Sequence, residues 1–152
     1  MARPLYMICS ESGVIDRHSN TVSAFNIIES IQIFEVQNKD DLQSAGLREA
    51  LPFLQLRVVA TWISDEGDRD QEYHFETRLR LPGHDEWQVV HHGTFHWKTK
   101  NHRLISNIRG LNVEQGTLLI VNRIRRTGEE GNWLTQQYEI GVESSGVIAT
   151  TD

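Results

Sequence analysis

The sequence predicts an all-β protein, an antiparallel β-sandwich of about seven to nine strands. Apolar and polar residues alternate along several extended runs, and clusters of Gly, Asp and Asn separate these runs. Alternation with a period of two is typical of a strand with one buried face, because successive side chains point to opposite sides of the sheet. The chain shows no βαβ pattern and no internal repeat, which disfavours parallel α/β folds and propellers.

The clearest alternation lies in residues 71–98, which read as one long antiparallel hairpin. In residues 71–82, Thr77 shares its parity with a set of apolar residues, and the opposite parity carries Glu, His and Arg. The apolar residues are Tyr73, Phe75, Leu79 and Leu81. Residues 86–98 form the second run, and residues 83–85 join the two. An apolar face of this length must be covered, so we expect a second sheet to stack against it.

The N-terminal part of the chain supplies three more candidate strands. Residues 5–9 are almost wholly apolar, which is typical of a strand covered on both faces, and Cys9 at the end of this run is expected to be buried. Residues 22–28 and 31–36 are rich in β-branched and aromatic residues, so they read as two strands or as one bent strand. The polar residues 16–20 read as a turn.

Residues 38–50 contain the one candidate helix. Asp40 or Asp41 can cap it, and its apolar residues are loosely spaced for a helix. Gly46 interrupts the pattern and Pro52 ends it. We therefore predict at most one short helix, in an insertion between strands.

Four further runs complete the predicted sandwich. They are residues 53–64 before the hairpin, and residues 102–113, 117–126 and 133–143 after it. In the last run Gln136 lies on the apolar parity. We expect a single folded domain over residues 1–143 and a flexible C-terminal tail over residues 144–152.

Composition narrows the class of protein. The chain has 152 residues, a formal net charge of -6 and one cysteine. The acidic balance makes nucleic acid an unlikely main partner, because phosphate binding needs clustered Lys and Arg. No window reaches the roughly 18 apolar residues of a membrane-spanning helix, and the N-terminal residues lack a secretion signal. A lone Cys9 cannot form an intrachain disulfide, so these features together predict a cytoplasmic protein with no membrane association.

Motifs of catalysis are sparse. The sequence contains no Gly-x-Ser-x-Gly elbow, no catalytic Cys signature and no Gly-rich phosphate loop. We therefore expect a protein that is not an enzyme and needs no cofactor. A hydrolase with an unrecognised site is kept as an alternative.

Six residues are candidates for contact with a ligand or partner. They are Trp133, Arg103, Arg123, Arg125, His92 and His96. Trp133 lies on the polar parity of its run, and an exposed Trp can anchor a sugar or a protein partner; ordinary packing is the alternative. Arg103 comes close to Arg123 and Arg125 if their strands pair, forming a local positive patch. Salt bridges to nearby Glu residues are the alternative for these arginines.

The histidines could also bind a metal. His92 and His96 lie on one face of a strand about 13 Å apart, which is too far for two ligands of one zinc ion unless the strand contains a bulge. His74 on the neighbouring strand could meet one of them, giving at most a two-ligand site. Surface histidines on a solvated sheet are the alternative.

An acidic turn offers a second candidate metal site. Asp65, Asp68 and Asp70 lie close together before the hairpin, and calcium prefers several oxygen ligands on a flexible loop. The turn lacks the ligand spacing of an EF-hand and contains Arg69. A solvated charged turn is the alternative.

The order of these pieces resembles a family of small uncharacterised bacterial β-sandwich proteins. The resemblance rests on four segments, which are residues 5–9, the FNIIESI segment at 25–31, the LPFL strand entry at 51–54 and the late strand at 116–121. It implies the sandwich fold and brings no established activity.

The fold and composition together predict a function of contact. We expect an interaction or assembly module, either an accessory subunit or a homo-oligomer of a bacterial system, in which unpaired sheet edges meet a protein partner. One alternative is a ligand-binding module for carbohydrate or calcium that uses the strand-end loops and an exposed Trp.

Overall fold

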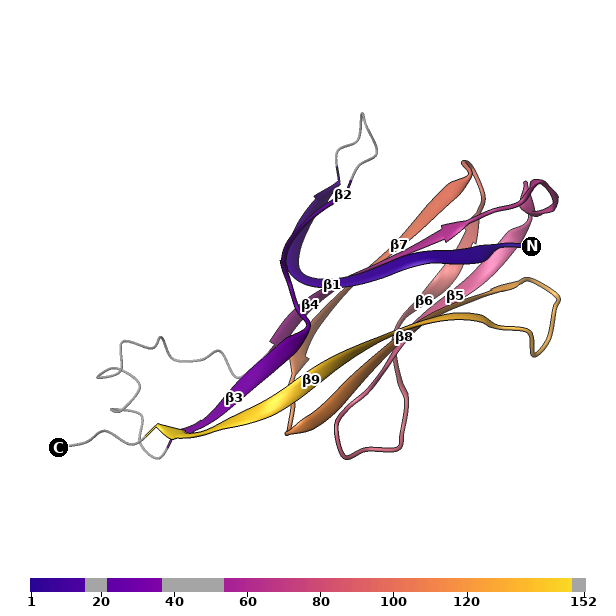
Figure 1. The fold of residues 1–152 in the computed structure, drawn as a ribbon. Helices are drawn as coiled ribbons and strands as arrows, with labels where there is room; N and C mark the ends of the chain where they lie inside the picture. Colours follow the sequence, from indigo (N-terminus) through magenta and orange to yellow (C-terminus); the bar gives the residue numbers. More distant parts are fainter. Residues whose placement is uncertain (16–21, 37–53, 149–152) are drawn as a thin grey trace.

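The computed structural model describes residues 1–15, 22–36 and 54–148 of the chain. Over these residues the chain forms nine β-strands and one short 3₁₀ helix, η1 (Glu66–Asp68). The strands build two sheets that stack as two layers (Figure 1). The predicted all-β sandwich is therefore confirmed. The helix expected within residues 38–50 lies outside the described residues.

One sheet has four strands and the other has five. The four-stranded sheet has the order β2 (Val22–Ile27), β1 (Arg3–Ile15), β4 (Leu54–Ile63) and β7 (Asn101–Leu111). The five-stranded sheet has the order β3 (Ser30–Val36), β9 (Leu134–Ile148), β8 (Gly116–Arg126), β5 (Glu72–Arg80) and β6 (Gln88–His96). Neighbouring strands are antiparallel except for the parallel pair of β3 and β9.

The chain crosses repeatedly between the two sheets. The orders β1-β4-β7 and β5-β8-β9 are those of strands A-B-E and C-F-G in immunoglobulin-type sandwiches. In sequence β7 lies between β6 and β8, yet it belongs to the four-stranded sheet, whereas β6 and β8 belong to the five-stranded one. The sheets also approach each other along one side, where β1 lies near β9 (Figure 1).

The predicted hairpin is confirmed as β5 and β6. Along β5 the side chains alternate between buried and half-buried, as a period of two requires. Residues 22–28 and 31–36 form two separate strands in different sheets. From the sequence we expect the last strand to end at residue 143. In the structure β9 continues to Ile148. Its partner there is β3, where Ile33 pairs with Ser144 and Val36 with Ile148.

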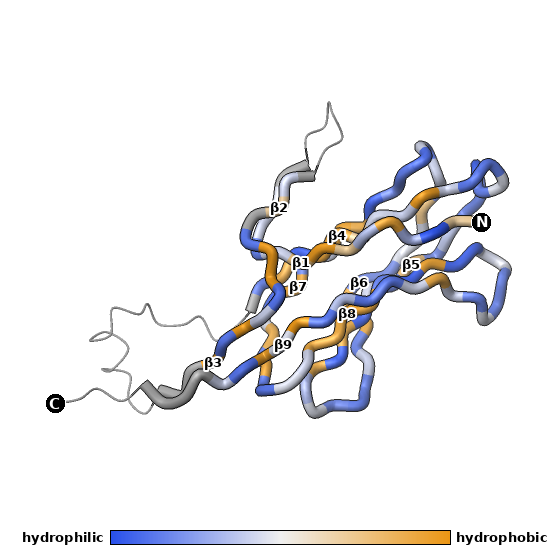
Figure 2. Tube along the Cα trace, viewed as in Figure 1, coloured by the Kyte–Doolittle hydropathy of each residue, from blue (hydrophilic) through white to orange (hydrophobic). Residues whose placement is uncertain are grey.

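The interior contains two hydrophobic clusters, and each includes residues of both sheets. Figure 2 shows apolar segments along strands of both layers. The aliphatic cluster includes Cys9, Leu56, Val58, Leu79, Ile108, Leu118, Ile120, Ile140 and Val142. The aromatic cluster includes Trp62, Tyr73, Phe75, Phe95, Trp97, Leu104 and Ile124. Met7 packs against both clusters. Burial of each large side chain contributes about 1.5–3 kcal/mol, so these clusters are the main source of stability.

A layer of polar side chains separates the two clusters, and we call it the polar layer. It consists of Thr77, Ser106 and Asn122. On its strand, each of them lies two positions from a residue of the aliphatic cluster on one side and two positions from a residue of the aromatic cluster on the other. Trp62 Nε1 donates to Asn122 Oδ1 at 2.8 Å, and Asn122 Nδ2 donates to Thr77 Oγ1 at 2.9 Å. Ser106 Oγ lies 2.8 Å from Thr77 Oγ1 and 2.9 Å from His91 Nδ1. These bonds join strands of both sheets through the core.

Candidate functional site

Charged and polar side chains gather on the outer face of β5, β6 and β8, away from the core. Strand register arranges them in three cross-strand rows. The first row pairs Glu72 with His96, the central row aligns Thr94, His74 and Arg125, and the third row aligns His92, Glu76 and Arg123. Side chains directly opposite each other on neighbouring strands lie about 4.5–5.5 Å apart at Cβ, so members of one row can interact.

The two outer rows each contain one carboxylate, and both carboxylates are partnered. Arg123 donates to Glu76 Oε2 from Nε at 3.0 Å and from Nη2 at 2.7 Å. Glu72 accepts a hydrogen bond from Thr127 Oγ1 at 3.1 Å, and its Oε1 lies 3.7 Å from His96 Nε2. Glu76 is therefore paired with a guanidinium, and Glu72 has a hydroxyl donor and a nearby imidazole.

The central row carries no carboxylate. Arg125 is half-buried, and within the described part of the chain its side chain forms neither an ion pair nor a hydrogen bond. Its Cζ atom lies 4.7 Å from the centroid of the Trp133 ring. The Cζ atom of Arg123 lies 4.1 Å from the same ring, so one indole holds two guanidinium groups by cation–π contacts.

A shallow pocket opens over the central row, and we call it the Arg125 pocket. It is lined by His74, Glu76, His92, Thr94, Arg125 and Trp133, together with residues 75 and 93. Its walls offer a guanidinium, the Glu76 carboxylate, a hydroxyl group, two imidazole rings and an indole ring.

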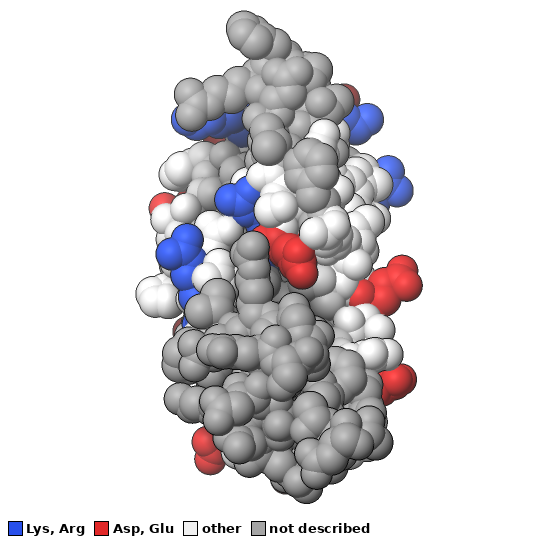
Figure 3. All heavy atoms as spheres, turned by 90° about the vertical axis from the view of Figure 1, so that its left-hand side faces the viewer, with Lys and Arg blue, Asp and Glu red and all other residues white. Residues whose placement is uncertain are grey.

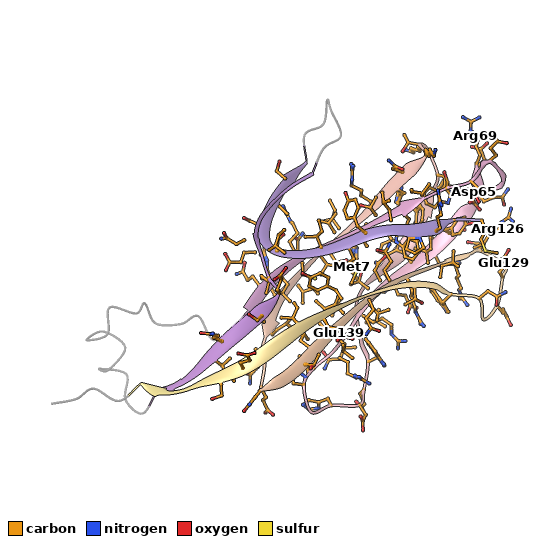
Figure 4. All side chains as sticks on the ribbon, in the orientation of Figure 1. Met7, Asp65, Arg69, Arg126, Glu129 and Glu139 are labelled. Atoms are coloured by element: carbon orange, nitrogen blue, oxygen red, sulfur yellow. The ribbon has the colours of Figure 1, made fainter. Side chains whose placement is uncertain are left out.

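Trp133 lies on the polar side of its run, as its parity predicts. Thr135, Gln137 and Glu139, which follow on the same parity, are exposed, and Figure 4 shows Glu139 on β9. Trp133 itself is only half-buried, because the two arginine side chains cover part of the ring.

The predicted grouping of Arg103 with Arg123 and Arg125 is wrong. Arg103 lies on β7 in the four-stranded sheet, opposite Thr61 of β4, whereas the other two lie on β8. The cause is the crossing of the chain between sheets after β6 and again after β7. Burial acts to raise the pKa of Tyr6, but hydrogen bonds to Thr61 and Arg103 outweigh it and lower the pKa overall. Arg103 therefore interacts with Tyr6 within the four-stranded sheet, away from Arg123 and Arg125.

The three histidines considered as metal ligands, His74, His92 and His96, do not converge. His74 lies opposite Thr94, between the positions of His92 and His96, and each of the other two faces a glutamate. Among the described residues no group of three or more His, Cys, Asp or Glu side chains is arranged to hold a metal ion.

The acidic turn is organised around Asp68. Only 3% of this residue is exposed, and its carboxylate accepts a hydrogen bond from Tyr73 Oη at 2.5 Å and one from the Asp65 backbone N–H at 2.9 Å. Asp65 Oδ2 lies 2.7 Å from the α-amino group of Met1, and Asp70 adopts a left-handed backbone conformation with φ 61°. Figure 4 shows Asp65 and Arg69 at this end of the sandwich. Both oxygens of Asp68 thus bond within the fold, which weakens the case for calcium here.

Two potential nucleophiles lie in the core. Ser106 is close to His91, but only 2% of it is exposed and its hydroxyl group also bonds to Thr77. Cys9 is fully buried, and burial raises the pKa of its thiol to about 12. Neither group is placed to attack a substrate from solvent.

Sequence reasoning placed Glu76 on the polar parity but did not select Glu76 or Thr94 as candidate contact residues. The signal was present in the hairpin, because the parity of His92 and His96 includes Thr94, and the parity of His74 includes Glu76. The register that brings these residues into rows is visible only once the strands are paired.

No protein-family model matches the chain, and no curated protein is significantly similar to it. The resemblance to small bacterial β-sandwich proteins therefore stays a prediction. No helix in the described residues is long and apolar enough to cross a bilayer. On the face seen in Figure 3, the described basic and acidic side chains are interspersed and form no continuous basic surface.

Proposed function

We propose that the chain is a non-enzymatic protein-binding module that meets its partner by strand addition at β6. The observation that supports this most directly is the exposure of β6. This strand is one of the two edge strands of the five-stranded sheet, and all of its residues except Gly93 and Phe95 are exposed. Two apolar residues are among them, since Val89 is 46% and Val90 38% exposed.

An edge strand carries a row of backbone groups that point away from its neighbour. Within the described residues β6 pairs only with β5, so its other side can accept an extended segment through main-chain hydrogen bonds. The register skips one residue at Val90, because Thr77 pairs with His91 and Arg78 with Val89. Such bulges limit indiscriminate pairing at sheet edges, which leaves residues 91–96 as the regular docking segment.

A second copy of the chain is the simplest partner for this edge. Two β6 strands related by a twofold axis pair with the same surface on both subunits, which joins the two five-stranded sheets into one. In this proposal the chain is a homo-oligomer, and it serves as an accessory subunit in a bacterial assembly.

Sedimentation at low and high protein concentration tests the proposal. We expect the wild type to dimerise as concentration rises, and the double substitution His92→Lys and Thr94→Lys, at exposed positions of the docking segment, to abolish dimerisation, because like charges then face each other across the edge. Ile27→Lys is the matched control, since Ile27 is a 55% exposed residue of β2 at the edge of the other sheet.

A wild-type chain that remains monomeric at the highest concentration contradicts self-association. Equal loss of dimer in the Ile27→Lys control moves the interface away from β6.

A further inference from the structure

We propose that the Arg125 pocket binds the carboxylate of an Asp or Glu side chain in an extended segment of a different protein. This inference rests on the proposed function, because it assigns the chemistry of a partner strand docked at β6. It starts from the distribution of charge over the three rows of the outer face.

The central row has a cation without a counter-ion. The flanking rows hold Glu72 and Glu76, both of them partnered, whereas Arg125 has no acidic partner among the described residues. Its guanidinium group is half-buried and held against Trp133. A guanidinium that is already positioned loses less conformational freedom on binding, so an incoming carboxylate gains a charge-assisted hydrogen bond at a reduced entropic cost.

The pocket suits a carboxylate better than a phosphate. Arg125 is the one Lys or Arg among its lining residues, and Glu76, the one carboxylate in the lining, is paired with Arg123. The planar fork of one guanidinium matches the two oxygens of a carboxylate. Thr94 and the imidazoles of His74 and His92 add donors around the same space.

The position of the pocket favours a peptide as the source of the carboxylate. The central row runs from Arg125 through His74 to Thr94, and Thr94 belongs to the edge strand. A segment paired with β6 adds one more position to this row, at the usual strand spacing of about 4.8 Å. An acidic side chain at that position starts next to Thr94, about 14 Å from Arg125 at the backbone, so it must extend over Thr94 to reach the pocket.

A second copy of the chain does not supply this carboxylate through β6. Residues 88–96 read QVVHHGTFH and contain no Asp or Glu. The pocket is therefore left unfilled in a β6-to-β6 dimer, and an acidic partner strand competes with self-association for the same edge.

Binding of two labelled peptides tests the inference. Both are extended heptapeptides of alternating Thr and Val, one with a central Glu and one with a central Gln. Fluorescence anisotropy at a protein concentration where the chain is monomeric is expected to show about tenfold tighter binding of the Glu peptide. The net charge of -6 opposes non-specific attraction of an acidic peptide, so the preference reports a local site.

Two variants locate the site. Arg125→Gln is expected to remove the preference for the Glu peptide, whereas Arg109→Gln, the same charge change at an exposed residue of β7, is expected to keep it. Thermal unfolding of both variants checks that each is folded. The Glu peptide is also expected to dissociate any β6-to-β6 dimer at lower concentration than the Gln peptide.

Three results overturn the inference. They are equal affinity of the wild type for the two peptides, a preference that survives Arg125→Gln, and absence of binding by either peptide. A uronic-acid oligosaccharide that binds more tightly than the Glu peptide overturns the peptide as the source of the carboxylate. The sedimentation experiment tests strand pairing at β6 independently of the peptides. The proposal of strand addition therefore holds or fails separately from carboxylate binding in the Arg125 pocket.

Discussion

Asn122 connects the two sheets through a single side-chain amide. Its oxygen accepts from the Trp62 indole and its nitrogen donates to Thr77, all within the core. A buried polar group that loses its hydrogen-bond partner still pays the full free energy of removal from water. A substitution of Asn122 therefore lowers stability by more than the loss of its few side-chain atoms implies.

Asn122→Ala is therefore expected to lower the free energy of unfolding by about 2–4 kcal/mol, because it leaves the Trp62 N–H and the Thr77 hydroxyl group short of a partner. Urea unfolding measures the change, and Asn132→Ala, at an exposed turn position, is the control. Equal stability of the two variants shows that the polar layer contributes little.

His102 gives the fold a dependence on pH. Its ring stacks on Phe95 with centroids 3.9 Å apart and planes 9° from parallel, and burial lowers its pKa from 6.5 to about 4. Between these values the unfolded chain binds a proton that the folded chain does not. Stability is therefore expected to fall as the pH decreases from 6.5 towards 4.

His102→Phe keeps a stacked ring and removes this titration, so the variant should lose less stability than the wild type on acidification from neutral pH to about pH 4. Urea unfolding at the two pH values provides the measurement. His84→Asn, at an exposed loop position, should behave as the wild type does, and a His102→Phe variant with unchanged pH dependence argues against a buried neutral imidazole.

At the scale of elements, the hairpin of β5 and β6 depends on close approach at one residue. A Cβ atom on Gly93 would lie 2.9 Å from Cε1 of Phe75, which belongs to the aromatic cluster. The absence of a side chain at Gly93 thus allows the Phe75 ring to occupy the space beneath the edge strand.

Gly93→Ala is expected to destabilise the protein by about 1–3 kcal/mol, because the added methyl group forces Phe75 out of its packed position. Gly141→Ala on β9 is the matched control, since no atom lies within 4 Å of a Cβ atom there. Thermal unfolding compares the two, and a larger effect at Gly141 contradicts the packing argument.

Alternation predicted the strands because it is a local property of the sequence. The alternation around Tyr73 and Phe75 can be read without knowing which strands pair. The sequence also shows that Thr77, Ser106 and Gln136 lie on the apolar faces of their strands. Their partners are not visible in the sequence, because Thr77 bonds to residues 29 and 45 positions away.

Assignment of strands to sheets lies beyond such local patterns. Arg103 and Arg123 are on successive strands, yet the chain changes sheet between them, so the predicted patch does not exist. The central row of the outer face depends on the register of three strands and could not be read from any one of them.

At the scale of the whole molecule, the C-terminal third of β9 pairs with β3, in the N-terminal part of the chain. Residues 144–148 pair in parallel with β3, which has no second neighbour among the described strands. A chain ending at residue 143 is expected to be at least about 1 kcal/mol less stable than one ending at Ile148, because backbone hydrogen bonds to β3 are lost.

Urea unfolding of the two truncated chains tests this, with the chain ending at Ile148 as the control that keeps all of β9. Equal stability of the two shows that the pairing with β3 adds nothing beyond residue 143.

The sealed position of Cys9 has a practical consequence. The chain has one cysteine, and that thiol is fully enclosed and stays protonated at neutral pH. A Thr94→Cys variant consequently presents a single reactive thiol to maleimide reagents, and Cys9 does not have to be substituted first. A nitroxide attached there reports by electron paramagnetic resonance whether two copies bring their labels together or a foreign strand keeps them apart.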